Sequence, residues 1–186
     1  SATIGTLQNS QLLNEPQFVE GSWQHGLNNL LSSYSGLTFA SGYGALLLGG
    51  AMNTRLGAFG LDVTQARTHL PSLGSQQGQS LRLSYAKTLN ATDTQIALAT
   101  YRYSTQGYFN LEDAFLNRQY LSGTSHSLDF FHQRSRSALT LGQPLTERYG
   151  QLYLTTSATR YWNYSGTDVN YTLGYSNHFN RLTYGL

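Results

Sequence analysis

Apolar and polar residues alternate in short stretches along much of the chain. In residues 80–85, leucine and tyrosine take the odd positions, whereas Ser80, Arg82 and Ser84 take the even positions. A similar alternation runs through residues 168–175. A repeat of two residues is the period of a β-strand, which places alternate side chains on opposite faces. The pattern therefore predicts strands with one face in apolar surroundings and the other in polar surroundings.

Turn-forming residues separate these stretches into about a dozen predicted strands. The predicted turns contain proline, glycine, asparagine or aspartate and lie at residues 71–75, 89–93, 143–147, 163–166 and 177–180. The predicted strands lie near residues 2–8, 17–27, 33–41, 44–54, 58–69, 78–88, 94–106, 125–132, 136–143, 150–162, 168–177 and 181–186. Many of them approach the ~10 residues that a tilted strand needs to cross a bilayer.

One segment, residues 110–120, departs from this period. Asn110 is a residue type that caps the N-terminus of a helix, and Asp113 follows three positions later. The apolar residues of the segment fall roughly on one side of a helix. We therefore expect an all-β, antiparallel fold with one short helix near residues 110–120.

Composition narrows the class of β-protein. Only 11% of the residues are charged, against ~25% in a typical soluble domain, while 13% are aromatic and 19 residues are glycine. The longest apolar run, residues 45–48, is far shorter than the ~20 residues of a membrane-spanning helix. Few charges with many Tyr, Gly, Ser and Thr favour a transmembrane β-barrel, whose strands are apolar on one face only. A soluble β-domain, such as an adhesion domain, shows the same alternation and is the alternative.

Aromatic residues gather near the ends of two predicted strands. The two groups are Tyr101, Tyr103 and Tyr108, and Tyr161, Trp162 and Tyr164. Amphipathic rings at strand ends are typical of the boundary between lipid and water. Tyrosine also favours strands in general, so this second explanation stays open.

The chain offers little for catalysis or metal binding. The absence of cysteine excludes disulfides and thiolate metal sites. His126 has Ser125, Ser127 and Asp129 nearby, the residue types of a barrel protease or lipase. Neighbouring residues of a strand point to opposite faces, so Ser125 and His126 would not meet. We expect no enzyme activity, no catalytic residues, no cofactor and no metal site.

Nucleic acid and nucleotides are not expected as ligands either. The net charge is only +2, and the basic residues are spread along the chain rather than gathered in a patch. The glycines at residues 42–44 lack the following lysine and helix of a phosphate-binding loop.

Residues 56–118 contain a series of short motifs in a fixed order. They are Asp-Val-Thr at 62–64 with Leu-Pro at 70–71, Gly-Gln-Ser-x-Arg at 78–82 with Tyr-x-Lys-x-Leu-Asn at 85–90, and Tyr-Arg-Tyr-Ser-Thr-x-Gly-Tyr at 101–108. In their order and spacing these motifs resemble the translocation barrel of the chaperone–usher ushers. Looser matches in the flanks extend the resemblance over most of the chain.

The resemblance implies an outer-membrane pore that secretes and assembles pilus subunits delivered by a periplasmic chaperone. Its partners would be chaperone–pilus subunit complexes and the lipid of the outer membrane. Residues 1–186 would form a single domain, a segment of the usher barrel that follows the plug domain. About a dozen strands make half of such a barrel, and open sheet edges are not tolerated in lipid. Further strands of a longer protein, closure into a smaller barrel or oligomerisation would cover these edges.

In such a pore the polar face of each strand lines the lumen. Arg82, flanked by Ser80 and Ser84, lies on the most regular polar face and is the best candidate for the lumen wall. The other candidates are Asp62, Arg102, Arg134 and Arg136. A solvated position at a strand end is the alternative for each of them. Charges on the wall of a pore affect what enters and how long it stays.

Overall fold

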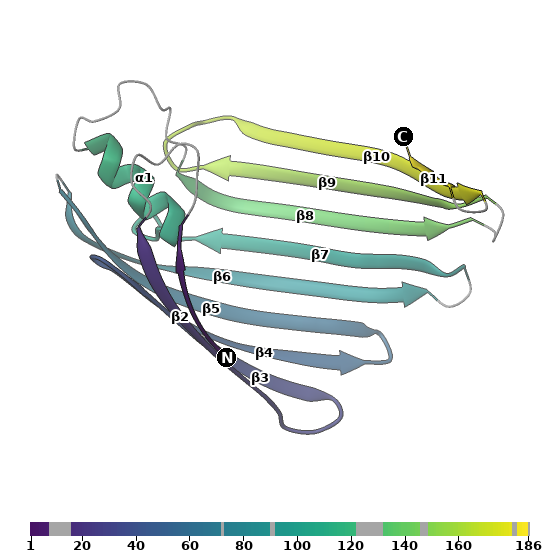
Figure 1. Ribbon diagram of the computed structural model, residues 1–186, viewed down its shortest axis with the longest axis horizontal. Coiled ribbons are helices and arrows are strands. Elements are labelled where there is room, and N and C mark those ends of the chain that lie inside the picture. The colour runs from purple at the N-terminus through teal and green to yellow at the C-terminus, as the bar shows by residue number, and fades with distance from the viewer. Residues whose placement is uncertain are drawn as a thin grey trace.

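A computed structural model describes residues 1–7, 16–71, 73–89, 92–121, 132–145, 149–179 and 182–185. Within these ranges the strands are β1 (Ala2–Thr6), β2 (Gln17–Gly26), β3 (Leu31–Ala40), β4 (Tyr43–Thr54), β5 (Gly57–Leu70), β6 (Gly74–Leu89), β7 (Thr94–Ser104), β8 (Gln133–Pro144), β9 (Gln151–Tyr161), β10 (Thr167–Phe179) and β11 (Leu182–Gly185). They form one antiparallel sheet in which each strand pairs with its neighbours in sequence (Figure 1). The predicted all-β architecture is confirmed. The strand predicted at residues 125–132 falls almost entirely outside the described residues.

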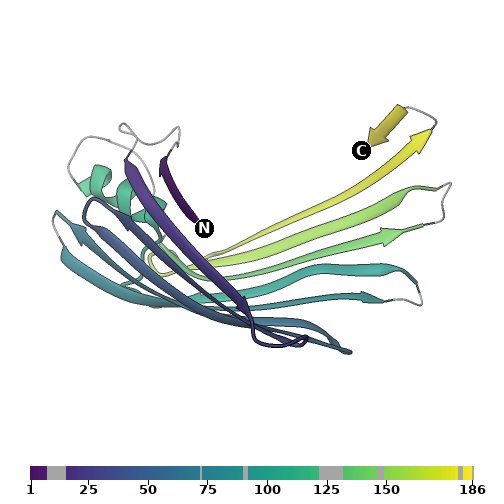
Figure 2. The same cartoon turned by 60° about the horizontal axis from the view of Figure 1, so that its bottom comes forward.

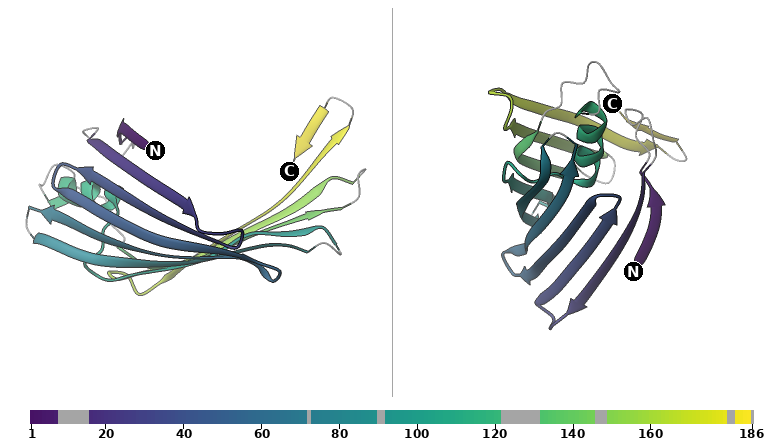
Figure 3. Two further views of the ribbon diagram at one scale, coloured as in Figure 1. Left: turned by 90° about the horizontal axis from the view of Figure 1, so that it is seen from below. Right: turned by 90° about the vertical axis from the view of Figure 1, so that its left-hand side faces the viewer.

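The sheet is strongly curved, and its curvature defines two faces. Figure 2 and the left panel of Figure 3 show the strands bending around a concave side, with β1 at one edge and β11 at the other. The helix α1 (Leu111–Leu121) lies on the concave side, at one end of the strands. That end of the sheet is extended by β5 and β6, which have 14 and 16 residues.

The predicted helix is confirmed, together with its cap. The Asn110 side-chain oxygen accepts a hydrogen bond from the Asp113 backbone N–H at 2.7 Å, and the Asn110 carbonyl accepts one from the Ala114 N–H at 2.9 Å. This is the contact that an N-cap residue makes with the first turn of a helix. The described residues include no helix with the length and hydropathy to cross a membrane.

The alternation in the sequence corresponds to these two faces. Leu48, Leu61 and Leu83 lie on the convex face, where 56%, 49% and 46% of their surfaces are exposed. Among the described residues, the buried apolar cluster lies instead between α1 and the concave face and consists of Tyr43, Ala66, Leu70, Tyr108, Phe109 and Ala114. The largest apolar surface therefore points away from the helix. This orientation suits a sheet with lipid outside, since a soluble barrel would turn its apolar face inward.

The first residues of two predicted turns, 143–147 and 177–180, belong to strands in the structure. Residues 143–144 complete β8, where Gln143 lies opposite Leu152, and residues 177–179 complete β10, where Asn177 lies opposite Tyr184. Pairing with a neighbouring strand overrides the turn preference of these residue types, and proline is tolerated at a strand end. The predicted turn at residues 163–166 is confirmed between β9 and β10.

Candidate functional site

Charged residues line up across the concave face at one level of the sheet. The register places Asp62 opposite Arg82, Arg82 opposite Arg102, and Arg102 opposite Arg136. Directly opposed residues of paired strands point to the same face. Four neighbouring strands, β5 to β8, therefore contribute one charge each to a transverse line.

The same line continues onto β9 and β10. Arg136 lies opposite Thr159, and Thr159 lies opposite Asp168. The Asp168 carboxylate accepts a hydrogen bond from the Tyr161 hydroxyl at 2.8 Å. We call Asp62, Arg82, Arg102, Arg136 and Asp168 the charged row. It has three arginines at its centre and an aspartate at each end.

Asp62 is the most constrained member of the charged row. Its side chain is almost fully buried, and its Oδ2 lies 2.7 Å from Nη2 of Arg82 and 2.8 Å from Nε. The same oxygen accepts a hydrogen bond from the Tyr34 hydroxyl at 2.9 Å. A buried carboxylate is stable only when it is paired and hydrogen-bonded, and these contacts satisfy that requirement. Arg82 is thereby held in one position on the concave face.

Arg102 and Arg136 have a different environment. Arg102 is half-buried and Arg136 is exposed, and among the described residues the one ion pair joins Arg82 to Asp62. Asp113 of α1 lies near enough to Arg102 for the two charges to interact. Burial, together with the charge of Glu112, raises the pKa of Asp113 to about 6, against the opposing effect of Arg102. Arg102 and Arg136 thus form no ion pair with a carboxylate in the described part of the chain.

The two serines predicted beside Arg82 differ in access. Both share the concave face with Arg82, because Ser80 lies opposite Thr64 and Ser84 lies opposite Gly60. Ser80 is only 3% exposed, and its hydroxyl lies 3.2 Å from that of Ser104. Ser84 is half-buried. Of the two, only Ser84 offers surface on the concave side.

Arg134 does not join the charged row. A register shift between Gln133 and Ser135 leaves it without an opposed residue on β9. Its guanidinium instead lies 4.7 Å from the centre of the Trp162 ring, in a cation–π contact at the end of the sheet. The alternation in the sequence could not show this shift, because a bulge changes the pairing without changing the pattern.

The connection after β7 turns into the concave side instead of ending at a membrane boundary. Gly107 packs so closely on the backbone of Gln77 that a Cβ atom there would overlap it, and Gly78 is likewise in contact with Tyr108. Tyr108 is consequently buried, so its predicted place among the boundary aromatics is wrong. Tyr101, by contrast, is 42% exposed.

His132 holds this inward connection from the other side. Its ring stacks on Phe109 with centroids 4.4 Å apart, and its Nε2 lies 2.8 Å from the Tyr108 carbonyl oxygen. Burial lowers the pKa of His132, which favours the neutral ring. The histidine is therefore a packing residue, and its role is not visible from its position in the sequence.

Arg118 fastens α1 to the sheet. Its guanidinium donates to the carbonyl oxygens of Ser41 and Gly42, which form the β3–β4 turn, and its Nε donates to the His69 carbonyl at 2.8 Å. Its Nη2 also lies 3.0 Å from the Thr68 hydroxyl. The sequence gives one weak signal for this contact, a basic residue in the last turn of a predicted helix.

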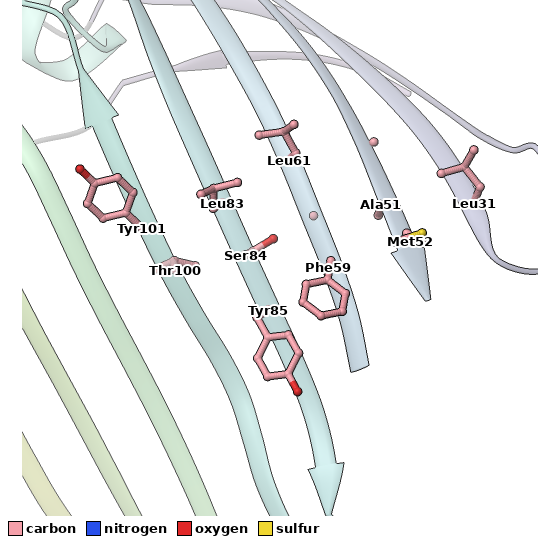
Figure 4. Close-up of a pocket in the computed structure, with 12 residues that line it drawn as sticks. Leu31, Ala51, Met52, Phe59, Leu61, Leu83, Ser84, Tyr85, Thr100 and Tyr101 are labelled. Atoms are coloured by element: carbon pink, nitrogen blue, oxygen red, sulfur yellow. The ribbon is translucent and has the colours of Figure 1, made fainter. Parts of the chain in front are cut away.

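The convex face is apolar over the same strands. Phe59, Leu61, Leu83, Tyr85 and Tyr101 surround a shallow depression of about 670 Å³ there, shown in Figure 4. Phe59, Leu61, Leu83 and Tyr101 are each more than 40% exposed. An uncovered apolar surface of this kind marks contact with lipid or with another protein.

His126, Ser125, Ser127 and Asp129 all lie outside the described residues. Within the described ranges, no group of three histidine or acidic side chains is arranged to hold a metal ion.

Comparison with known proteins gives a consistent result. The family model "Outer membrane usher protein" matches residues 1–186. The curated "Outer membrane usher protein MrkC" of Klebsiella pneumoniae is 38% identical over 184 residues, which are 99% of this chain and 22% of that protein.

Two solved structures resemble the fold. "Structure of the P pilus usher (PapC) translocation pore" has a TM-score of 0.70 at 25% identity and covers 99% of this chain, which spans 37% of that chain. An E. coli P pilus tip assembly intermediate, PapC-PapD-PapK-PapG, also has a TM-score of 0.70, at 26% identity, with 96% of this chain and 22% of that chain covered. The present chain thus spans about a fifth of the length of the curated usher. Because the family model and the curated relative both match almost every residue, the chain belongs to the outer membrane usher family.

Proposed function

We propose that this chain forms part of the wall of an outer-membrane pore that secretes and assembles pilus subunits. In this proposal residues 1–186 are a single barrel segment that follows the plug domain. The observation that carries it is the separation of the two faces, with apolar side chains on the convex side and the charged row on the concave side. Membership of the usher family and the likeness to the P pilus usher translocation pore support it.

The pore acts by conduction and performs no chemical step. A folded protein passes through a wide lumen only when the wall offers few apolar patches that would retain it. The concave face fits this condition, because it carries small or polar residues such as Gly49, Asp62, Thr64 and Ser84. Lipid would cover the convex face, which carries the large apolar residues.

The surface of the lumen wall would consist of Arg82, Ser84, Arg102 and Arg136. Asp62 and Ser80 lie on the same face but are buried, so they would support this surface from beneath. Arg134 would lie at the rim, where it contacts Trp162. Charged side chains on a lumen wall tune the passage of charged cargo.

The proposed partners are complexes of a periplasmic chaperone with pilus subunits. The support is the solved PapC-PapD-PapK-PapG intermediate, whose usher resembles this chain. The outer membrane is the chain's location, as for the curated relatives that carry this family's name.

Adjacent residues on β6 provide the test. Ser84→Cys places a thiol on the concave face and Leu83→Cys places one on the convex face, in a chain that has no cysteine of its own. The variants are made in the full-length protein, with any other cysteine replaced, and treated in intact membranes with a hydrophilic maleimide. We expect rapid labelling at residue 84 and protection by lipid at residue 83. Pili on the cell surface report assembly. Equal labelling at both positions, or labelling at residue 83 alone, would contradict the proposal.

A further inference from the structure

We infer that Arg102 and Arg136, beside the fixed Arg82–Asp62 pair, form a subsite that binds carboxylate groups of an acidic protein segment inside the pore. The inference rests on the proposed function, because it requires the concave face to line an aqueous interior.

Three arginines that stand side by side repel one another. Arg82, Arg102 and Arg136 are directly opposed on three consecutive strands. Like charges placed directly opposite each other destabilise a sheet. Asp62 neutralises Arg82, but no described carboxylate forms an ion pair with Arg102 or Arg136. A bound anion would offset this repulsion.

The width of the arginine site suits carboxylate groups on a protein segment. Neighbouring strands lie ~4.8 Å apart, so the three guanidinium groups start from a wall about 10 Å wide. Arg102 is half-buried and Arg136 exposed, so both can be reached from the concave side. A planar guanidinium matches a carboxylate with two parallel hydrogen bonds. An extended segment with carboxylates on alternate residues spaces them by about 7 Å, which fits within this width.

The position of the site favours protein carboxylates over lipid phosphates and polyanions. The concave face points away from the apolar face that lipid would cover, so lipid headgroups do not reach Arg102. The positive stretch is narrow, with Asp62 and Asp168 at its ends and Asp113 near Arg102. These acids repel a continuous polyanion, whereas one or two isolated carboxylates fit between them.

The experiment measures binding of a fluorescent peptide with alternating glutamates to the full-length protein in detergent. A second peptide carries glutamine at the same positions. The test variant is Arg102→Gln with Arg136→Gln. The matched control is Arg67→Gln with Arg160→Gln. These two arginines are exposed on the convex face, and their replacement removes the same amount of charge. Heat-modifiable mobility in each variant confirms a folded barrel.

We expect the test variant to bind the glutamate peptide about tenfold to hundredfold more weakly, while the control keeps the affinity of the parent. Lysine at both positions restores only part of the affinity, since lysine lacks the planar fork. Equal affinity in the test and control variants would overturn the inference, as would equal binding of the glutamine peptide. Displacement by inorganic phosphate as efficiently as by the peptide, at matched ionic strength, would reveal a general anion site and also overturn it.

The labelling of Ser84→Cys separates this result from the proposed function. If residue 84 labels in membranes and the peptide affinity is unchanged by the arginine substitutions, only the carboxylate subsite is wrong. If residue 84 does not label, the pore wall itself is wrong and the subsite fails with it.

Discussion

The ring of Tyr34 lies over Gly49, the residue directly opposite it on β4. A methyl group at position 49 would overlap the Tyr34 ring and approach the Cβ of Asp62. The tyrosine hydroxyl reaches across β4 to donate to Asp62 at 2.9 Å. Gly49 therefore clears the path by which Tyr34 supports the buried end of the charged row.

Gly49→Ala is expected to destabilise the barrel by about 1 to 3 kcal/mol, because it forces Tyr34 off its position in a closely packed place. The neighbouring Gly50→Ala is the matched control, since its Cβ would lie 3.7 Å from its nearest neighbour, the Ser32 carbonyl oxygen. The measurement is the temperature at which heat-modifiable mobility is lost. Equal midpoints for the two variants would show that Tyr34 does not depend on the glycine.

Asp62 and Arg82 are expected to be energetically coupled. Arg82→Gln leaves a nearly fully buried carboxylate with only Tyr34 as a described hydrogen-bond donor, and we expect a loss of about 1 to 3 kcal/mol in unfolding free energy. Asp62→Asn combined with Arg82→Gln removes the buried charge and should recover part of that loss. A double-mutant cycle in denaturant gives the coupling energy. Simple additivity of the two single changes would mean that the 2.7 Å ion pair contributes nothing.

Arg118→Ala is expected to release α1 while leaving the sheet intact. The side chain satisfies carbonyl groups of Ser41, Gly42 and His69, and no other described side chain reaches them. Hydrogen exchange should show lost protection in α1 and unchanged protection in β5 and β6. Arg118→Lys should behave like the alanine variant, because one ammonium cannot match the arginine fork. Arg67→Ala, on the opposite face of β5, is the control. Loss of protection throughout the sheet would contradict a local anchoring role.

The alternation of side chains was sufficient to predict much of the fold. Leu81 and Leu83 share one face with Tyr85, and Arg82 shares the other with Ser84, as a repeat of two residues requires. The helix cap at Asn110 could also be predicted from the sequence, since a cap is a local interaction. Candidate wall residues followed from the same parity.

Long-range pairing was not predictable in this way. That Arg82, Arg102 and Arg136 stand side by side depends on the register of three strands, and a bulge between Tyr85 and Lys87 alters that register locally. Arg118 contacts Gly42 and Ser41, which precede it in the sequence by 76 and 77 positions. Tyr108 looked like a boundary aromatic because nothing local reports that its loop folds inward over Gly78.

Docking of α1 is expected to depend on pH through Asp113. Burial and the charge of Glu112 raise the pKa of this carboxyl from 3.8 to about 6, while Arg102 opposes the shift. The docked helix therefore favours the protonated form, which an undocked helix loses near pH 4. Docking is strongest below about pH 4, weakens as the pH rises towards 6 and is constant above that, with a total change of up to about 3 kcal/mol.

Hydrogen exchange of the α1 amides, expressed as protection factors to remove the intrinsic effect of pH, measures this change. Asp113→Asn keeps a neutral side chain of the same shape, so its α1 should stay protected as the pH rises from 4 to 7. His132 also packs beside this region, and burial lowers its pKa, so its protonation loosens the connection at acidic pH in both proteins. The difference between parent and variant isolates Asp113. If the two proteins lose protection in parallel across this range, the carboxyl does not control docking.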